Sequence, residues 1–299
     1  MNTSNPLVSI IIPFYNHNDY IYKTLDSVLE DKYSNKEIVI INDGSSNPND
    51  SNITKWIDKN SEIIKIKYIK RENKGLTKTL NELISLAKGK YILLCASDDY
   101  LINNTIKSRV DILENNPDKY LLLSDAIVID ENNNIIYESS LFDLYKGKKE
   151  NYFNDDGLKT EITSNWSVAG ATHLIRKELY DLVGLYDENL LVEDYDFFLR
   201  VVARDFILYY DEKVSAYRRH ETNVSGDILK ELKMFKEIKK VVLKNLYLFD
   251  DKYKHKLLTV VEYYEDKMKN YYLRNFIRIA RKKTKRHRDK VKKIFRKKK

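Results

Sequence analysis

The sequence contains few of the residues that define several common protein classes. Its only cysteine, Cys95, excludes an internal disulfide and is compatible with a reducing compartment. Eight glycines and four prolines among 299 residues are too few for a fibrous or low-complexity chain. No apolar run reaches the ~18 residues of a membrane span, and Met1–Pro6 is too polar for a signal peptide. We therefore expect a globular protein that does not cross a bilayer.

Positive charge is in excess, but it is concentrated at one end of the chain. The net charge of the whole sequence is +8. Residues 281–299 contain 13 Lys and Arg against one acid, Asp289, which is a local charge of +12 and leaves −4 for the other 280 residues. The body of the protein is therefore mildly acidic, and its C-terminal tail is strongly basic.

The N-terminal third alternates between strand and helix patterns. Short β-branched or alternating runs predict strands at Val8–Pro13, Glu37–Ile41, Ile64–Ile69 and Tyr91–Cys95. Apolar residues at helical spacing predict helices between them, at Tyr20–Leu29 and Gly75–Ala87. Such strand–helix–strand units form right-handed crossovers between parallel strands. The pattern predicts an α/β domain with a mostly parallel, Rossmann-like sheet.

The rest of the chain predicts further elements and a helical end. We expect a strand at Tyr120–Ile129, a loop excursion at Phe142–Thr163, helices at Lys177–Val183 and Tyr195–Ala203, and short strands at Phe206–Tyr210 and Val214–Tyr217. Neither Gly nor Pro occurs after Gly226, and apolar stripes among Lys and Glu predict helices at Ile228–Leu248 and Lys252–Ala280. We therefore expect an α/β domain at residues 6–226 and a helical C-terminal extension at 227–299.

Polar and aromatic residues follow each of the first four predicted strands. They are Pro13-Phe14-Tyr15-Asn16, Asn42–Ser46, Asn73–Gly75 and Ser97–Asp99. Ligands of an open parallel sheet bind beyond the carboxyl ends of its strands. A ring that can stack on a base and a carboxylate that can accept its N–H suit a nucleoside. The adjacent carboxylates of Asp98 and Asp99 repel each other, so either a divalent cation or solvent at the strand end must compensate.

Six stretches between Pro6 and Gly226 resemble the motifs of the family 2 glycosyltransferases, in the order of that family. They are VSIIIPFYN, VIINDGSS, NKG with the later AKGKYI, ASDD, GLYDENLLVEDYDFFLR, and YRRHETNVSG. The resemblance implies the GT-A fold and an inverting transfer of a sugar from a UDP-sugar donor to a hydroxyl of a saccharide acceptor. It points to the type that makes bacterial polysaccharides, O-antigens or capsules.

The resemblance also implies a nucleotide and metal site at the strand ends. The residues that would contact the nucleotide are Pro13, Tyr15, Asn16, Asp43, Asn73, Gly75, Ser97 and Asp98. In the family the first three frame the base and ribose, and the Asp matched by Asp43 bonds the uracil. Asp98 and Asp99 match the motif that holds Mn²⁺ or Mg²⁺ on the donor diphosphate. Many relatives carry Asp where this chain has Ala96, so which of the two acids touches the metal stays open.

Further matches concern the acceptor side and the diphosphate. His220 matches a late histidine that completes the metal site or contacts the diphosphate, against the alternative of a surface histidine. Asp194 matches the general base, with Glu193 orienting the acceptor, although two acids at a helix N-terminus also fit a capping role. The residues expected to line the acceptor or phosphate side are Trp166, Gly170, Arg218 and Arg219.

Two other functions compete with glycosyl transfer. A sugar nucleotidyltransferase needs a Gly-rich basic loop after its first strand, and PFYNHNDY contains no Gly. Nucleic-acid binding would rest on the tail alone, and the acidic body argues against it. The tail interleaves Phe276 and Ile294 with Lys and Arg, which fits a basic amphipathic helix on anionic lipid. We expect a cytoplasmic protein, peripheral on the inner face of the cell membrane, with a saccharide or lipid-linked saccharide acceptor and no nucleic-acid partner.

Overall fold

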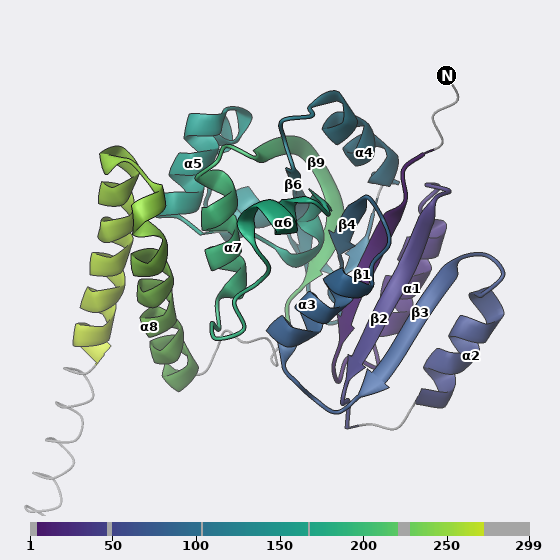
Figure 1. Cartoon of the computed structure of the whole chain (residues 1–299). Coiled ribbons are helices and arrows are strands. Elements are labelled where there is room, and N and C mark those ends of the chain that lie inside the picture. The colour runs from purple at the N-terminus through teal and green to yellow at the C-terminus, as the bar shows by residue number, and fades with distance from the viewer. Residues whose placement is uncertain (1–4, 47–49, 103, 167, 221–227, 272–299) are drawn as a thin grey trace, which may run out of the picture.

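The computed structural model describes residues 5–46, 50–102, 104–166, 168–220 and 228–271 (Figure 1). Its centre is a curled sheet that begins with parallel strands in the order β3-β2-β1-β4. Their bounds are β1 Val8–Phe14, β2 Lys36–Asp43, β3 Lys65–Arg71 and β4 Tyr91–Leu94. The crossover helices are α1 Ile21–Glu30, α2 Asp50–Asn60 and α3 Leu76–Leu86. The predicted α/β class with a mostly parallel sheet is confirmed, and α2 is an addition to it.

The second half of the sheet mixes strand directions. It continues from β4 in the order β8-β6-β9-β5, and β7 pairs with β6. Strand β8 is antiparallel to both of its neighbours, whereas β6 and β9 are parallel. The bounds are β5 Tyr100–Leu101, β6 Leu121–Ile129, β7 Ile135–Tyr137, β8 His173–Arg176 and β9 Ile207–Arg218. The short β5 pairs with β9, which brings the residues after β4 next to the end of β9.

Each face of the sheet buries its own apolar core. Successive side chains of a strand point to opposite faces, so Ile10 and Ile12 of β1 join one core and Ile11 joins the other. The Ile10 face is covered by α1, α2 and α4 Ile106–Asn115. The Ile11 face is covered by α3, α5 Asp155–Ser164, α6 Leu179–Val183, α7 Glu193–Val202 and α8 Ile228–Asn245. The functional residues lie where these layers meet the strand ends.

Two predictions about the middle of the chain are wrong. Phe142–Thr163 is not a loop, because it contains parts of the short helices η1 Ser140–Leu144 and η2 Lys149–Phe153 and most of α5. Asp125 of β6 caps η1 by accepting the N–H groups of Ser140 and Leu141 at 3.0 and 3.1 Å, a long-range contact that no local periodicity encodes. The two short strands predicted between residues 206 and 217 are one strand, β9, which pairs with β6 through two register irregularities.

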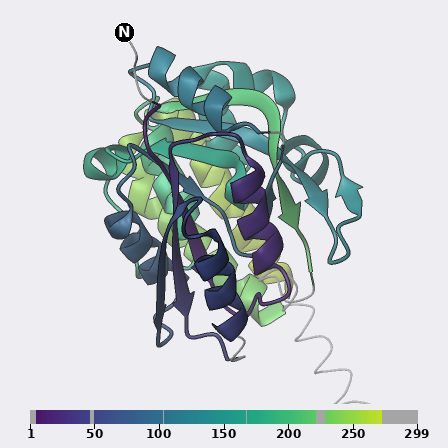
Figure 2. The same ribbon diagram turned by 90° about the vertical axis from the view of Figure 1, so that its right-hand side faces the viewer.

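The C-terminal helices pack on the α/β domain. Helix α8 is followed by the short η4 Leu246–Leu248 and a helix over residues 251–271. Ile238, Val241 and Val242 of α8 are buried in the same core as Phe197 of α7. Figure 2, in which the parallel strands face the viewer, shows these helices behind the sheet. The boundary predicted at 226/227 stays a prediction, because burial of α8 in this core is compatible with one unit or with two.

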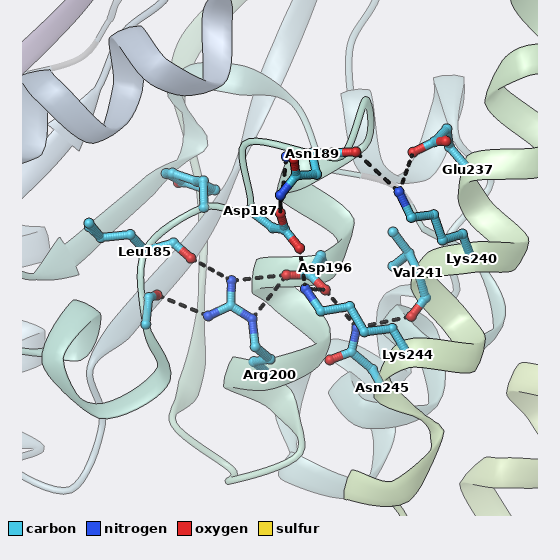
Figure 3. Close-up of polar contacts among 12 residues, drawn as sticks. Leu185, Asp187, Asn189, Asp196, Arg200, Glu237, Lys240, Val241, Lys244 and Asn245 are labelled. Atoms are coloured by element: carbon cyan, nitrogen blue, oxygen red, sulfur yellow. Dashed lines mark hydrogen bonds and ion pairs between the residues drawn. The ribbon is translucent and has the colours of Figure 1, made fainter.

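A buried carboxylate also joins α8 to α7 (Figure 3). Asp196 of α7 has no exposed surface and accepts bonds from Arg200, Lys244 and Asn245, at 2.8–3.1 Å. Among the described residues, no helix is both long and apolar enough to span a membrane. The predicted basic amphipathic tail lies outside the described residues.

Candidate active site

The loops after β1 and β2 are tied to each other. Asn16 has a positive φ of 57°, and its side-chain carbonyl accepts the backbone N–H of Ser46 at 2.8 Å. Its own N–H donates to the Ser45 hydroxyl at 2.9 Å. The ring of Tyr15 next to it is 47% exposed, whereas Pro13 lies within β1, opposite Ile41. Asn16 therefore shapes the loop, and Tyr15 presents a ring on which a planar base can stack.

Asp43 ends β2 and organises the loop that follows β3. Its carboxylate accepts the backbone N–H groups of Lys74 and Gly75, both at 2.9 Å, and pairs with the guanidinium of Arg71. The Asn73 side chain donates to the Asp43 carbonyl at 2.8 Å. Gly75 has a φ of 91°, which favours glycine at this turn. The structure therefore brings Asp43, Asn73 and Gly75 together, and Arg71 joins them; their contact with a nucleotide stays a prediction.

Three side chains at the ends of β1, β4 and β9 form a compact ligand cluster. His17, Asp98 and His220 each offer one atom, and these atoms lie within 4.8 Å of one another. The Asp98 carboxylate is 3.0 Å from His220 Nε2 and 3.6 Å from His17 Nδ1. Ser97 holds His17 through a 2.9 Å bond to the same Nδ1. Two imidazoles and a carboxylate fit a first-row ion such as Mn²⁺ better than Mg²⁺, which prefers oxygen ligands.

His17 is the residue of this cluster that the sequence interpretation missed. It directly follows Asn16 in the first strand-end motif, and that position was the available signal. Burial lowers the pKa of His17, the carboxylate of Asp98 opposes this, and His220 adds to it. The ring of His220 stacks on Tyr20 at a centroid separation of 5.6 Å. A neutral imidazole is the form that binds a metal, so these surroundings suit a ligand.

Asp99 lies next to Asp98 in the chain but in other surroundings. It is buried, and its Oδ1 accepts the backbone N–H of Arg218 at 2.8 Å. Burial and the neighbouring Asp98 raise the pKa of the Asp99 carboxyl well above its usual range. A Cβ on Gly170 would come within 3.0 Å of Asp99 Oδ2, so these two residues are in close contact. The structure does not bring Asp99 into the cluster of His17, Asp98 and His220.

Arg218 supports the loop that carries Asp98. It is 1% exposed, and its Nε donates to the Asp98 carbonyl at 2.9 Å. Its Nη2 donates to the Asn133 side chain at 2.8 Å, and the guanidinium lies 4.6 Å from the Tyr20 ring centroid. The backbone N–H of Arg219 donates to the Ile129 carbonyl at 2.8 Å. The contacts of Arg218 position Asp98.

Glu193 and Asp194 form the N-terminus of α7. Burial and the charge of Asp194 raise the pKa of Glu193 to about 8, and burial raises the pKa of Asp194 to about 6. Asp194 Oδ1 accepts the N–H of Tyr195 at 2.7 Å. Both pKa values are therefore raised toward the neutral range, which suits carboxyl groups that exchange a proton near neutral pH.

Tyr145 lies near both Asp194 and Asp99, and no sequence pattern indicated it. Burial is the main cause that raises the pKa of Tyr145, and the carboxylates of Asp194 and Asp99 both add to it. The phenol therefore lies within the field of both acids. Trp166 packs against Tyr195, with ring centroids 5.2 Å apart. The structure thus places Trp166 beside the residue that follows Asp194 and Gly170 beside Asp99.

Sequence comparisons identify relatives of this chain. The model of the family described as "Glycosyl transferase family 2" matches residues 9–184. The uncharacterized glycosyltransferase RT0329 of Rickettsia typhi is 30% identical over 247 residues, which are 82% of this chain and 74% of that protein. The UDP-Glc:alpha-D-GlcNAc-diphosphoundecaprenol beta-1,3-glucosyltransferase WfaP of Escherichia coli is 38% identical over 108 residues, which are 36% of this chain and 41% of WfaP.

Structural comparisons show the GT-A fold. TarS of S. aureus, solved with UDP-GlcNAc, has a TM-score of 0.64 at 19% identity, covering 86% of this chain and 71% of TarS. The mannosyltransferase PcManGT of Pyrobaculum calidifontis, solved with GDP-Man and Mn²⁺, has a TM-score of 0.63 at 15% identity, covering 88% and 70%. Together with the family match over more than half of the sequence, these findings mean that the chain belongs to glycosyltransferase family 2.

Proposed function

We propose that this protein is an inverting glycosyltransferase that moves a sugar from a UDP-sugar to a hydroxyl of a saccharide acceptor in cell-surface glycan synthesis. The observation that carries the proposal is the meeting of His17, Asp98 and His220 at the strand ends of a family 2 domain whose helix α7 begins with Glu193 and Asp194. The UDP-GlcNAc bound by TarS and the UDP-Glc in the name of WfaP support a UDP-sugar donor.

The three clustered residues would hold a divalent metal. His17, Asp98 and His220 supply two imidazoles and one carboxylate, and Mn²⁺ accepts this set more readily than Mg²⁺. A bound cation neutralises the charge of the donor diphosphate and stabilises the leaving nucleotide. The Mn²⁺ bound by PcManGT supports this assignment. Asp99 would act indirectly. Its bond to the backbone N–H of Arg218 would fix the loop that carries Asp98.

The nucleotide would lie across the ends of β1, β2 and β4. Tyr15 offers an exposed ring for the base, and Asn16 holds the loop that carries this ring. Asp43 fixes the turn at Asn73–Gly75, so the nucleotide would meet a preformed edge. Ser97 would act through His17, to which it is bonded. Pro13 would line the floor of this site from within β1.

Asp194 would take the proton of the acceptor hydroxyl during attack on the anomeric carbon. A base works best when its pKa lies near the working pH, and burial brings the pKa of Asp194 to about 6. Glu193, protonated at neutral pH, would donate a hydrogen bond to the acceptor. The same attack expels UDP from the opposite side of the sugar, and this in-line geometry inverts the anomeric configuration.

The basic tail would bring the enzyme to the cytoplasmic face of the cell membrane. Its charge of +12 over residues 281–299 is attracted to anionic lipid, at ~1 kcal/mol per cation near the surface. The acceptor in the name of WfaP is linked through a diphosphate to undecaprenol. Such a lipid-linked acceptor is embedded in the membrane, so an enzyme bound to the membrane surface would meet it there.

Screening the purified protein against UDP- and GDP-sugars, with the released nucleotide as readout, tests the proposed donor. We expect release of UDP from one UDP-sugar, in the presence of Mn²⁺ and an oligosaccharide acceptor. Release of GDP alone would instead favour a GDP-sugar, as bound by PcManGT. Release of pyrophosphate from a nucleoside triphosphate and a sugar phosphate would contradict glycosyl transfer and favour a nucleotidyltransferase.

A further inference from the structure

A cavity of about 590 Å³ lies between the α/β domain and the C-terminal helices. One wall contains Trp166 and Tyr195, and the facing wall comes mainly from the helix over residues 251–271. Tyr195 directly follows the proposed base Asp194 in α7, although Asp194 does not itself line the cavity. The cavity is separate from the nucleotide site, which lies at the strand ends.

The walls of this cavity are aromatic but not purely apolar. The rings of Trp166 and Tyr195 lie 5.2 Å apart, and across the cavity those of Tyr263 and Tyr264 also lie 5.2 Å apart. Tyr195 is 1% exposed, and its hydroxyl has no hydrogen-bond partner among the described residues. Flat rings with polar edges and a buried hydroxyl without a partner suit a ligand that has both apolar C–H faces and hydroxyl groups. A sugar ring has both.

The charged side chains that line the cavity are all cationic. Its titratable lining includes the cations Lys256 and Lys267 together with His255, and none of the described residues that line it is Asp or Glu. The Lys267 ammonium lies 4.4 Å from the Tyr263 ring centroid, which holds this cation at the aromatic wall. Asp156 lies within the field of Lys256, but no carboxylate of the described residues lines the cavity itself, so a neutral sugar would offer the two cations no partner there. An anionic group on the sugar would pair with them.

We propose that this cavity is a second saccharide subsite, which binds a sugar that carries a phosphate or a carboxylate group. This inference rests on the proposed function, since it assigns the bound sugar to the part of the acceptor beyond the attacked hydroxyl. The aromatic walls would cover the faces of the ring, Tyr195 would bond a hydroxyl, and Lys256 and Lys267 would hold the anionic group. The C-terminal helices would thereby select an acidic glycan as acceptor.

Fluorescence of Trp166 gives a readout that needs neither donor nor turnover. The chain has two tryptophans, and Trp56 lies on α2, where it donates to Asp26 at 2.8 Å. In the full chain, Trp56→Phe leaves Trp166 as the reporter in the cavity wall. We expect a saturable change with N-acetylglucosamine 1-phosphate or with glucuronate, and the stronger of the two identifies the phosphate or the carboxylate as the natural anion. N-acetylglucosamine and inorganic phosphate should each bind more weakly than the stronger acidic sugar.

Charge-removing variants in this background test the assignment of the anionic group. Lys256→Gln combined with Lys267→Gln should raise the Kd of the acidic sugar roughly fivefold or more, since both charge-assisted contacts are lost. Lys269→Gln is the matched control on the same helix, because Lys269 is 74% exposed and pairs with Asp266 outside the cavity. It should leave the Kd unchanged.

The proposal would be overturned by equal binding of neutral and acidic sugars, by inorganic phosphate binding as tightly as the sugar phosphate, or by an unchanged Kd in the double variant. Failure of the proposed function is recognised separately. If the protein binds the acidic sugar but releases no nucleotide in the donor screen, the subsite is supported and the transferase assignment is contradicted. A protein that turns over donor but gives no Trp166 response keeps the assignment and loses the subsite.

Discussion

Asp98 and Asp99 are neighbours in the chain, and their different surroundings explain how two like charges coexist at one strand end. Asp98 faces His17 and His220, which lie 3.6 and 3.0 Å from its carboxylate. Asp99 faces inward and accepts the backbone N–H of Arg218. Burial favours the protonated form of Asp99, so the pair need not carry two full charges. One acid is available to a ligand and the other fixes the loop.

Removal of the proposed base should separate binding from chemistry. We expect Asp194→Asn to fold and bind UDP like the wild type, because Asp194 acts on the acceptor and only in the transition state. Turnover should fall ~10²–10⁴-fold, the usual contribution of a general base. Steady-state UDP release measures the effect, and UDP calorimetry is the control for binding. A variant that keeps more than about a tenth of wild-type turnover would assign the base to another residue.

The raised pKa values of Asp194 and Glu193 predict a bell-shaped pH profile. Below about 6 Asp194 is protonated and cannot accept a proton, so kcat/KM should fall with acid. Above about 8 Glu193 loses its proton and can no longer donate, so kcat/KM should fall again. The profile is measured with saturating Mn²⁺ and UDP-sugar. Glu193→Gln should keep the acid limb and lose the alkaline limb, and an unchanged alkaline limb would contradict the role given to Glu193.

The sequence motifs located most of the candidate residues but did not show which role each of them has. Asp98 and His220 could be predicted, because each stands in a recognisable motif after a strand. His17 was missed although it follows the first strand-end motif, since its role depends on contacts with residues 81 and 203 positions away in the chain. Tyr145 could not be predicted, because the segment around it shows no periodicity. Local patterns encode elements, and contacts between distant elements complete the site.

At the scale of elements, the α7–α8 interface depends on one buried acid. We expect Asp196→Ala to lower the free energy of unfolding by about 2 kcal/mol, because the buried Asn245 and the largely buried Arg200 each lose an acceptor. Urea denaturation followed by circular dichroism measures this change. Asp266→Ala is the control, since its pair with Lys269 is exposed and should contribute less than about 1 kcal/mol. Equal effects of the two variants would contradict a structural role for the interface.

The fold was predictable where apolar periodicity was strong. Strands β1 to β4 with α1 and α3 follow from β-branched runs and helical spacing, and the structure confirms them with small shifts at their ends. The helices between residues 140 and 164 were not predictable, because Asp125 of β6 caps the first of them from outside the segment and Tyr152 is buried by long-range packing. Strand β9 was predicted as two strands because Asp211, Glu212 and Lys213 interrupt its apolar pattern. Its pairing with β6 shifts register after Tyr209 and resumes at Lys213.

At the scale of the whole molecule, we expect membrane binding to depend on the basic tail and activity to depend on the rest of the chain. A chain ending at Ala280 keeps α8 and the helix over residues 251–271, which pack on the domain, and loses the basic residues 281–299. We expect it to retain activity on a short soluble acceptor and to lose co-sedimentation with anionic vesicles. Binding of the full chain should weaken with salt, because screening acts over ~10 Å at ~0.1 M. Unchanged vesicle binding after the cut would place the anchor elsewhere, and tight DNA binding at physiological salt would revive a nucleic-acid function.

The central claim is that His17, Asp98 and His220 bind the donor nucleotide through a metal. Calorimetric titration of UDP into the wild-type protein, once with Mn²⁺ and once with EDTA, tests this claim most directly. Without the cation, Asp98 would repel the diphosphate. We therefore predict that UDP binds with Mn²⁺ and that EDTA weakens the affinity by about tenfold or more, which is ~1.4 kcal/mol. Equal affinity under both conditions would contradict the metal site and the account built on it.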